Sequence, residues 1–236
     1  MRRSTHSSAS AANWAFARVP DPGGTASLST LLGDQVVLPL VEVDDGAQAV
    51  SVARALLDNG LPVSESALRT AEAMDAVDVV RSSVPEAIVG VGTVWSPDQL
   101  AAAVASGAAF AVSPGSSDDL LNAASGLSIP FVPGVATATE LMRVTTFGIR
   151  EAKFFPAQSA GGAAAVSALG SVAPSVRLLP TGGIDATSAP GYLALANVFA
   201  VGGSWVCPRA LVRSGSWDAI GELASVASRL VGHAAP

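Results

Sequence analysis

Several residue types that enzymes commonly use for chemistry are scarce in this sequence of 236 residues. The only histidines, His6 and His233, lie near the two ends of the chain, which argues against a His-based catalytic triad or a His-ligated metal site. The single cysteine, Cys207, can form no internal disulfide and has no cysteine partner for zinc, which fits a reducing, cytoplasmic compartment. No apolar run reaches the roughly 18 residues that a membrane span requires.

Lysine is scarcer still, because Lys153 is the only lysine in the chain while arginine is used elsewhere. A genome that favours arginine codons explains most of this bias, but it does not explain why the one remaining lysine stands in an apolar run. Arginine cannot replace a primary amine that must lose a proton and attack a carbonyl group. Lys153 is therefore the first candidate for a catalytic residue.

The composition indicates one globular domain that buries a large core. Half of the residues are hydrophobic, 14% are charged, and the net charge is −6. An acidic chain without a basic run is a poor nucleic-acid binder, because phosphate neutralisation needs clustered lysine and arginine. We expect residues 1–26, which include the Pro- and Gly-rich segment 20–24, to form a flexible N-terminal leader. The domain is expected over residues 27–236, a length typical of one α/β barrel.

Short apolar runs alternate with segments of helical periodicity along this domain. Helices are predicted over Gly46–Asn59 and Thr70–Arg81, where apolar residues recur at helical spacing. Further helix starts are predicted at Ser96, at Ser116 or Ser117, and at Thr137 or Thr139, which are all good N-caps. Eight strands are predicted, at Val36–Val43, Leu61–Leu68, Ala87–Val94, Phe110–Ser113, Ile129–Pro133, Glu151–Phe155, Val176–Leu179 and Asn197–Val201.

Strands that are apolar throughout and are joined by helices indicate a parallel sheet whose outer face is covered. Eight such units in a chain of this length favour a closed (β/α)8 TIM barrel, with a doubly wound open sheet as the alternative. The Gly- and Ala-rich segment 161–170 is the weakest of the predicted helices. In a barrel of this kind the active site lies at the carboxyl ends of the strands.

Two charged residues interrupt predicted strands, and both are candidates for that site. Strand alternation places Lys153 on the barrel interior if Phe154 packs outward against helices. An ammonium group is poorly solvated there, which favours the neutral, nucleophilic amine. Glu65 interrupts the second strand in the same way, and without a core histidine it is the natural general acid and base. The alternative for both residues is a purely structural ion pair.

Polar and glycine-rich segments follow several predicted strands. Arg69, at the exit of the second strand, has the fork geometry that binds a substrate carboxylate, although it reads equally well as a surface arginine. The turns at 181–183 and 202–204 are Gly-rich and follow the last two strands, where barrel enzymes often bind phosphate. The segments 90–93 and 113–115 add further positions at which backbone can approach a ligand closely.

Taken in chain order, these segments resemble the family of 2-keto-3-deoxy-6-phosphogluconate (KDPG) aldolase and 4-hydroxy-2-oxoglutarate (KHG) aldolase. The resemblance runs from about Val36 to about Leu230, and the Lys-Phe-Phe-Pro-Ala and Pro-Thr-Gly-Gly-Ile blocks are its most specific parts together. The matching segments are Glu65–Thr70, Gly90–Val94, Ser113–Gly115, Pro133–Gly134, Lys153–Ala157, Pro180–Ile184 and Gly202–Trp205.

The resemblance implies a role for each of these residues. Lys153 would form the Schiff base with the substrate ketone, and Glu65 would move protons during carbinolamine formation and carbon–carbon cleavage. The products would be pyruvate and glyceraldehyde 3-phosphate, the cleavage step of Entner–Doudoroff metabolism, without a metal or organic cofactor. The family is commonly a homotrimer. Arg69, Thr93 and Pro114 would hold the pyruvate moiety, Phe155 would pack against it, and Thr181, Gly182, Gly183, Gly203 and Ser204 would bind the distal phosphate.

The sequence departs from the family at a few positions. Glu42 stands near the end of the first strand, where many members carry arginine, and a reversed charge there disfavours an anionic substrate tail if Glu42 points inward. Gln158 stands where glutamate is frequent, and Ser64, Ser66 and Ala67 replace β-branched residues. Three alternatives stay open: a KHG, galacto or unphosphorylated substrate, a metal-dependent pyruvate aldolase, and a catalytically silent phosphosugar-binding barrel.

Overall fold

The computed structural model describes residues 27–68 and 73–232, and strands alternate with helices along this part of the chain. The predicted leader, residues 1–26, lies outside the described residues. The strands are β1 Val37–Val41, β2 Val63–Ala67, β3 Ile88–Gly92, β4 Ala111–Val112, β5 Phe131–Val132, β6 Gly134–Val135, β7 Glu151–Phe154, β8 Arg177–Pro180 and β9 Val201–Gly203. The helices are α1 Leu28–Leu32, α2 Gly46–Asp58, α3 Ala73–Ser83, α4 Pro97–Ala105, α5 Asp118–Ala124, α6 Ala138–Thr146, α7 Gly162–Val172, α8 Ala189–Leu193, α9 Arg209–Ser214 and α10 Trp217–Ala227.

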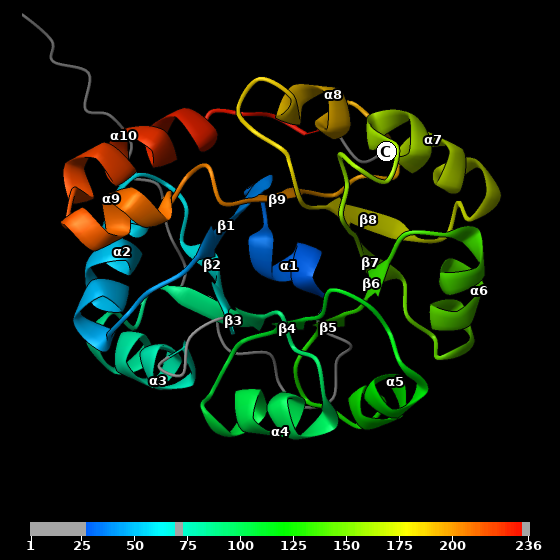
Figure 1. Ribbon diagram of the computed structural model, residues 1–236, viewed down its shortest axis with the longest axis horizontal. Coiled ribbons are helices and arrows are strands. Elements are labelled where there is room, and N and C mark those ends of the chain that lie inside the picture. Colours follow the sequence, from blue (N-terminus) through cyan, green and yellow to red (C-terminus); the bar gives the residue numbers. More distant parts are fainter. Residues whose placement is uncertain (1–26, 69–72, 233–236) are drawn as a thin grey trace, which may run out of the picture.

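Every pair of neighbouring strands runs parallel, as predicted. Six strands form one sheet in the order β5-β4-β3-β2-β1-β9, and three form a second sheet in the order β6-β7-β8. Figure 1 shows the strands around the centre of the molecule, with α2 to α10 on the outside. Two isolated parallel bridges, Leu178 to Val198 and Thr181 to Gly202, lie between the β8 and β9 segments.

Each predicted strand overlaps an observed one, although the bounds differ, and the fifth and the eighth differ for a reason that the structure shows. The fifth is interrupted at Pro133, which has no backbone N–H to donate, and it resumes as β6. The eighth begins later than predicted, because Val198 N–H closes a turn on the Leu195 carbonyl and Asn197 donates its side-chain amide to the Val166 carbonyl. Sequence alternation does not reveal such a turn within an apolar run.

The predicted helix starts are confirmed by hydrogen bonds of the capping side chains. Ser96, Ser117 and Thr137 accept from the backbone N–H groups three residues further on, and Glu140 completes a capping box with Thr137. The predicted helix Thr70–Arg81 is observed as α3 from Ala73, and residues 70–72 lie outside the described part of the chain. The Gly- and Ala-rich segment forms α7, as predicted.

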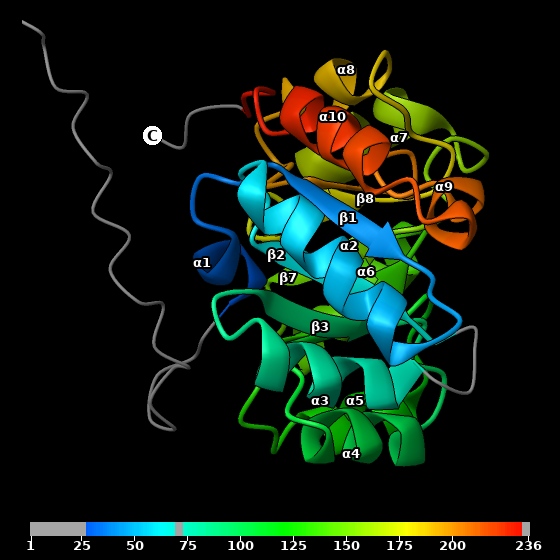
Figure 2. The same ribbon diagram turned by 90° about the vertical axis from the view of Figure 1, so that its left-hand side faces the viewer.

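Alternate residues of the strands pack on two sides of the sheets. Phe154 and Ala152 join the core against the surrounding helices, which confirms that Phe154 points outward. The opposite side holds a separate cluster that includes Leu38, Val63 and Phe110. Helix α1 was not predicted, and it inserts Leu28 and Leu32 into this inner cluster. Figures 1 and 2 place α1 in the middle of the strands, at their amino ends, so this end of the interior is filled.

No helix among the described residues is both long and apolar enough to cross a membrane.

Candidate active site

Lys153 and Glu65 meet in the interior, although they come from different sheets. Lys153 lies on β7 and Glu65 on β2, and the distance from Lys153 Nζ to Glu65 Oε1 is 3.4 Å. Lys153 is 3% exposed and Glu65 is fully buried. The other carboxylate oxygen, Glu65 Oε2, is buried and has no hydrogen-bond partner among the described residues. An amine, a carboxylate and an oxygen atom without a partner among the described residues therefore lie together in one buried site.

Gly92 makes room for the Glu65 carboxylate. It ends β3 and pairs with Ala67 on β2, so its α-carbon faces the site. A β-carbon at position 92 would overlap Glu65 Oε1 and Cδ. Glycine is therefore the only residue type at position 92 that allows the Glu65 carboxylate to occupy this position. The sequence drew attention to segment 90–93 as a place of close approach, and the structure shows that the approaching group is the protein's own side chain.

The Phe155 ring lies over the amine, with its centroid 5.5 Å from Lys153 Nζ. This position allows a cation–π contact with the ammonium form and presents an apolar surface to anything attached to the nitrogen. Backbone hydrogen bonds fix both residues, because Lys153 N–H donates to the Pro133 carbonyl and Phe155 N–H to the Val135 carbonyl. The amine therefore projects from rigid strand backbone.

Thr93 and Pro114, two predicted pyruvate contacts, follow β3 and β4 at their carboxyl ends. Thr93 has a φ angle of 63°, which is a strained conformation for a β-branched residue. Strain of this kind concentrates at binding and catalytic sites. Pro114 lies so close to β6 that a β-carbon on Gly134 would overlap its carbonyl group. Arg69, the predicted carboxylate ligand, lies outside the described residues.

The two Gly-rich turns predicted to bind phosphate are neighbours. Thr181, directly after β8, forms a parallel bridge with Gly202 on β9. Gly182 and Gly183 have φ angles of 102° and 76°, which favour glycine over other residues. Trp205 packs on the second turn, because a β-carbon at Gly203 would overlap its ring. The backbone of both turns is thereby brought to one place at the carboxyl ends of the strands.

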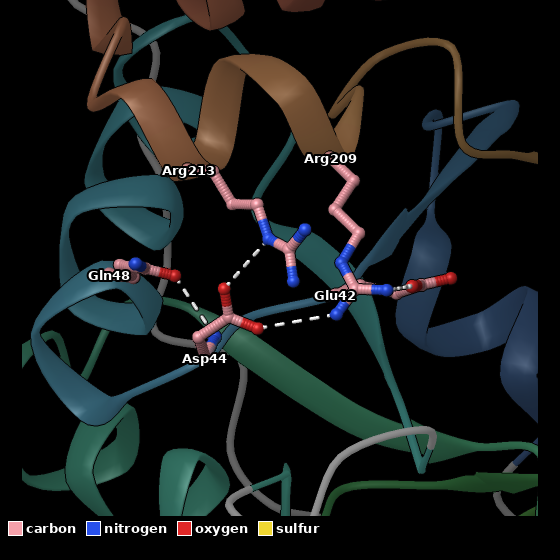
Figure 3. Close-up of polar contacts among 5 residues, drawn as sticks. All are labelled: Glu42, Asp44, Gln48, Arg209 and Arg213. Carbon is pink, nitrogen blue, oxygen red and sulfur yellow. Dashed lines mark hydrogen bonds and ion pairs between the residues drawn. The ribbon is translucent and has the colours of Figure 1, made fainter.

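Sequence reasoning missed a cluster of ion pairs next to these turns, drawn in Figure 3. Arg209, at the start of α9, contacts Glu42 through Nη1 at 3.5 Å and Asp44 through Nη2 at 3.3 Å. Arg213 contacts the second Asp44 oxygen through Nε at 3.0 Å. The Arg213 hydrogen bond is the main reason why the pKa of Asp44 lies below its ordinary value of 3.8, and the hydrogen bond from Arg209 adds to it. The one sequence signal was Glu42 itself, whose charge Arg209 balances.

Within residues 27–68 and 73–232 no group of three or more His, Cys, Asp or Glu side chains is placed to hold a metal ion. Cys207 is buried, and this burial raises the pKa of its thiol to about 12, which leaves it unreactive at neutral pH.

Comparison with known proteins shows the family to which the chain belongs. A family model described as "KDPG and KHG aldolase" matches residues 29–223. A 2-dehydro-3-deoxy-phosphogluconate aldolase from Pseudoalteromonas atlantica is 44% identical over 191 residues, which cover 81% of this chain and 89% of that protein. The chain belongs to the KDPG/KHG aldolase family. The resemblance read from the sequence motifs is thereby confirmed.

Solved structures of KDPG aldolases share the fold. The Legionella pneumophila enzyme, solved with pyruvate captured as a covalent carbinolamine intermediate, has a TM-score of 0.82 and 36% identity, over 91% of this chain and 99% of that one. The Zymomonas mobilis ZM4 enzyme, solved with 3-phosphoglycerate, has a TM-score of 0.81 and 38% identity, over 88% of this chain and 98% of that one. KDPG/KHG aldolases are carbon–carbon lyases, and this chain has their parallel α/β fold.

Proposed function

We propose that this protein is a class I aldolase that cleaves KDPG to pyruvate and glyceraldehyde 3-phosphate through an imine on Lys153. The observation that carries the proposal is the buried contact between Lys153 Nζ and Glu65 Oε1 in a chain of the KDPG/KHG aldolase family. The covalent carbinolamine that pyruvate forms in the Legionella pneumophila relative supports imine chemistry on this fold.

Glu65 begins the reaction by accepting a proton from Lys153, 3.4 Å away, which frees the nitrogen lone pair to attack the C2 ketone carbon of the substrate. The carbinolamine then loses water, with Glu65 returning a proton to the departing hydroxyl, and a protonated imine remains. Glu65 next accepts the proton of the C4 hydroxyl while the C3–C4 bond breaks. The electron pair of that bond enters the imine, so the aldehyde leaves and an enamine remains on Lys153.

Pyruvate is released by the reverse of these steps. The enamine takes a proton at C3, water adds to the imine carbon, and the carbon–nitrogen bond breaks to regenerate the amine. Glu65 supplies and recovers these protons, because it is the carboxylate in contact with Lys153 and its Oε2 has no partner among the described residues. The buried site excludes bulk water, which keeps the enamine from premature side reactions.

The remaining residues are assigned to the two halves of the substrate. Arg69, Thr93 and Pro114 bind the pyruvate moiety and its carboxylate, and Phe155 packs against it from its place over Lys153. Thr181, Gly182, Gly183, Gly203 and Ser204 bind the terminal phosphate, which the juxtaposition of the two turns supports. The presence of 3-phosphoglycerate in the Zymomonas mobilis relative agrees with a phosphorylated ligand in this family.

We also propose how the two sheets are joined and how the protein assembles. The two sheets close into one (β/α)8 barrel, which the bridges from β8 to the β9 segment and the pairing of β9 with β1 support. The assembly is a homotrimer, as the family resemblance implies, and its compartment is the cytoplasm, as the single cysteine indicates. No cofactor is required, because an amine and a carboxylate carry the whole reaction.

Borohydride trapping tests the proposal directly. Incubation with pyruvate and borohydride should add one reduced pyruvyl group at Lys153, and the assignment is unambiguous because the chain has no other lysine. Lys153→Ala and Lys153→Arg should both abolish the adduct and cleavage, since a guanidinium stays protonated. An active Lys153→Arg variant, or turnover without an adduct, would contradict the imine. Persistence of activity in EDTA excludes the metal-dependent aldolase.

KHG is the second candidate substrate, because the matching family model covers both activities. Turnover on KDPG, its galacto isomer, the unphosphorylated acid and KHG ranks the candidates by kcat/KM. Absence of cleavage with all four, together with phosphosugar binding, would indicate the silent barrel instead.

A further inference from the structure

The inner face of β1 extends from the hydrophobic core to the rim of the site, by which we mean the carboxyl ends of the strands around Lys153 and Glu65. Leu38 belongs to the inner hydrophobic cluster, and Leu40 Cδ1 is 3.3 Å from the β-carbon position of Gly202 on the neighbouring strand β9. Val41 and Val43 face the opposite way, toward α2 and α3. Glu42, which lies between them and follows the strand, is therefore on the inner face.

The strand register places Glu42 above the reacting groups. Leu40 is paired with Glu65, so Glu42 lies two residues, or about 7 Å, further toward the carboxyl ends of the strands. On the other side β1 pairs with β9, where Pro39 is opposite Gly203. Glu42 is thus at the rim between Glu65 and the turn that contains Gly203, where the part of the substrate beyond the cleaved bond would lie.

Arg209 reaches this rim from the helix that follows the same turn. Its guanidinium lies between the carboxylates of Glu42 and Asp44, at 3.5 and 3.3 Å (Figure 3). An arginine side chain offers five N–H donors, more than these two contacts use, and the Arg209 side chain remains 45% exposed. The two carboxylates hold the guanidinium in place without using all of its hydrogen-bonding capacity.

The charges of this cluster sum to zero when Arg213 is included. Without Arg209, the carboxylate of Glu42 at the rim would repel a phosphate dianion. With Arg209 in place, the same position offers a fixed cation to that anion.

We propose that Arg209 is a specificity-determining residue that binds the terminal phosphate of the substrate, together with the backbone of the Gly-rich turns. This inference rests on the proposed function and deepens it, because it assigns the residue by which the enzyme prefers phosphorylated over unphosphorylated sugar acids. Glu42 and Asp44 are positioning residues for the guanidinium.

The test compares KM and kcat of the full-length enzyme on phosphorylated and unphosphorylated 2-keto-3-deoxygluconate. Arg209→Gln should raise KM for the phosphorylated acid by about tenfold to a hundredfold, the usual value of a charge-assisted hydrogen bond. It should leave kcat and the KM for the unphosphorylated acid within about twofold, because the reacting groups are untouched. Inhibition by inorganic phosphate should weaken in parallel.

Two further variants distinguish phosphate binding by Arg209 from a purely structural role in the ion-pair cluster. Arg213→Gln, on the same helix, removes a contact to Asp44 alone and should leave both KM values unchanged. Glu42→Gln keeps a side-chain oxygen that can accept from the Arg209 guanidinium and removes only the negative charge, so it should not raise KM for the phosphorylated acid. If either variant raises KM for the phosphorylated acid as much as Arg209→Gln does, the role of Arg209 is structural and the inference is wrong. The same conclusion follows if Arg209→Gln raises both KM values equally.

Different measurements would contradict the proposed function and the role of Arg209. Wild-type enzyme that forms no pyruvate adduct would overturn the imine mechanism, whatever Arg209 does. Phosphate binding, measured by calorimetry on wild-type and Arg209→Gln protein, tests the inference without turnover. Equal phosphate affinity of the two proteins would overturn it.

Discussion

Lys153 Nζ lies 3.4 Å from Glu65 Oε1, and the two residues belong to strands of different sheets and are separated by 88 positions in the chain. Two buried charges at this distance stabilise one another, but Glu65 Oε2 has no hydrogen-bond partner within residues 27–68 and 73–232, so this part of the chain does not fully satisfy the pair. A carboxylate that only neutralised the lysine would be expected to have both oxygens hydrogen-bonded. The contact therefore supports the proposed role of Glu65 in proton transfer, with its second oxygen available to a ligand.

Glu65→Gln tests the proton-transfer role. The amide has the same shape but cannot accept a proton, so kcat for cleavage should fall by about a hundredfold to ten-thousandfold. Steady-state kinetics measures the loss, and borohydride trapping should show slower adduct formation at Lys153. Glu86→Gln, at an exposed turn before β3, serves as the matched control and should be fully active. A Glu65→Gln enzyme with near-normal kcat would assign proton transfer to another group.

Gly92→Ala tests whether the site depends on the space above Gly92. The added methyl group overlaps the Glu65 carboxylate, so the carboxylate must move away from Lys153 and activity should fall by at least tenfold. Overpacking should also lower stability by about 1–3 kcal/mol. Gly126→Ala meets no atom within 4 Å and should change neither property. Equal kcat/KM values for the two variants would show that Glu65 tolerates displacement.

Ser64→Val tests whether a small cavity between β2 and helices α2 and α3 lowers the stability of the protein. Ser64 and Ser66 point away from the interior into a cavity of about 20 Å³ that apolar residues of α2 and α3 also line. Valine fills the space and suits a strand, so the variant should gain about 1 kcal/mol and a few degrees in melting temperature. Ser64→Ala removes the hydroxyl without filling the cavity and should gain less. A lower melting temperature for Ser64→Val would mean that the hydroxyl is needed.

The pKa of Asp44 predicts an acid-dependent loss of the ion-pair cluster. Because the pKa is lowered in the folded protein, the stabilisation is fully present above the ordinary value of 3.8 and is lost as pH falls through the folded value. NMR titration of the carboxyl carbon measures this directly. Arg213→Gln should raise the pKa more than Arg209→Gln does, since the Arg213 hydrogen bond is the largest cause. The opposite order would contradict the observed geometry.

The sequence determined the repeating units and singled out Lys153 as the candidate nucleophile. The alternation of apolar runs with capped helices predicted the strands, because burial on both faces and capping are local properties of the chain. The isolation of Lys153 in an apolar strand, with Phe154 as its outward neighbour, predicted the direction of the amine. The charge of Glu65 within a predicted strand and the Gly-rich turns after the last two strands indicated further site residues, and the family resemblance then implied a role for each.

Only the tertiary structure decided which distant groups meet. The register of β2 with β3 places Gly92 against Glu65, and no local pattern encodes that overlap. The break at Pro133 and the turn at Asn197 depend on hydrogen-bond partners from other segments. The pairing of Glu42 with Arg209 reversed the expectation that the rim is simply negative, because the two residues are far apart in the chain and the parallel pairing of β9 with β1 brings them together.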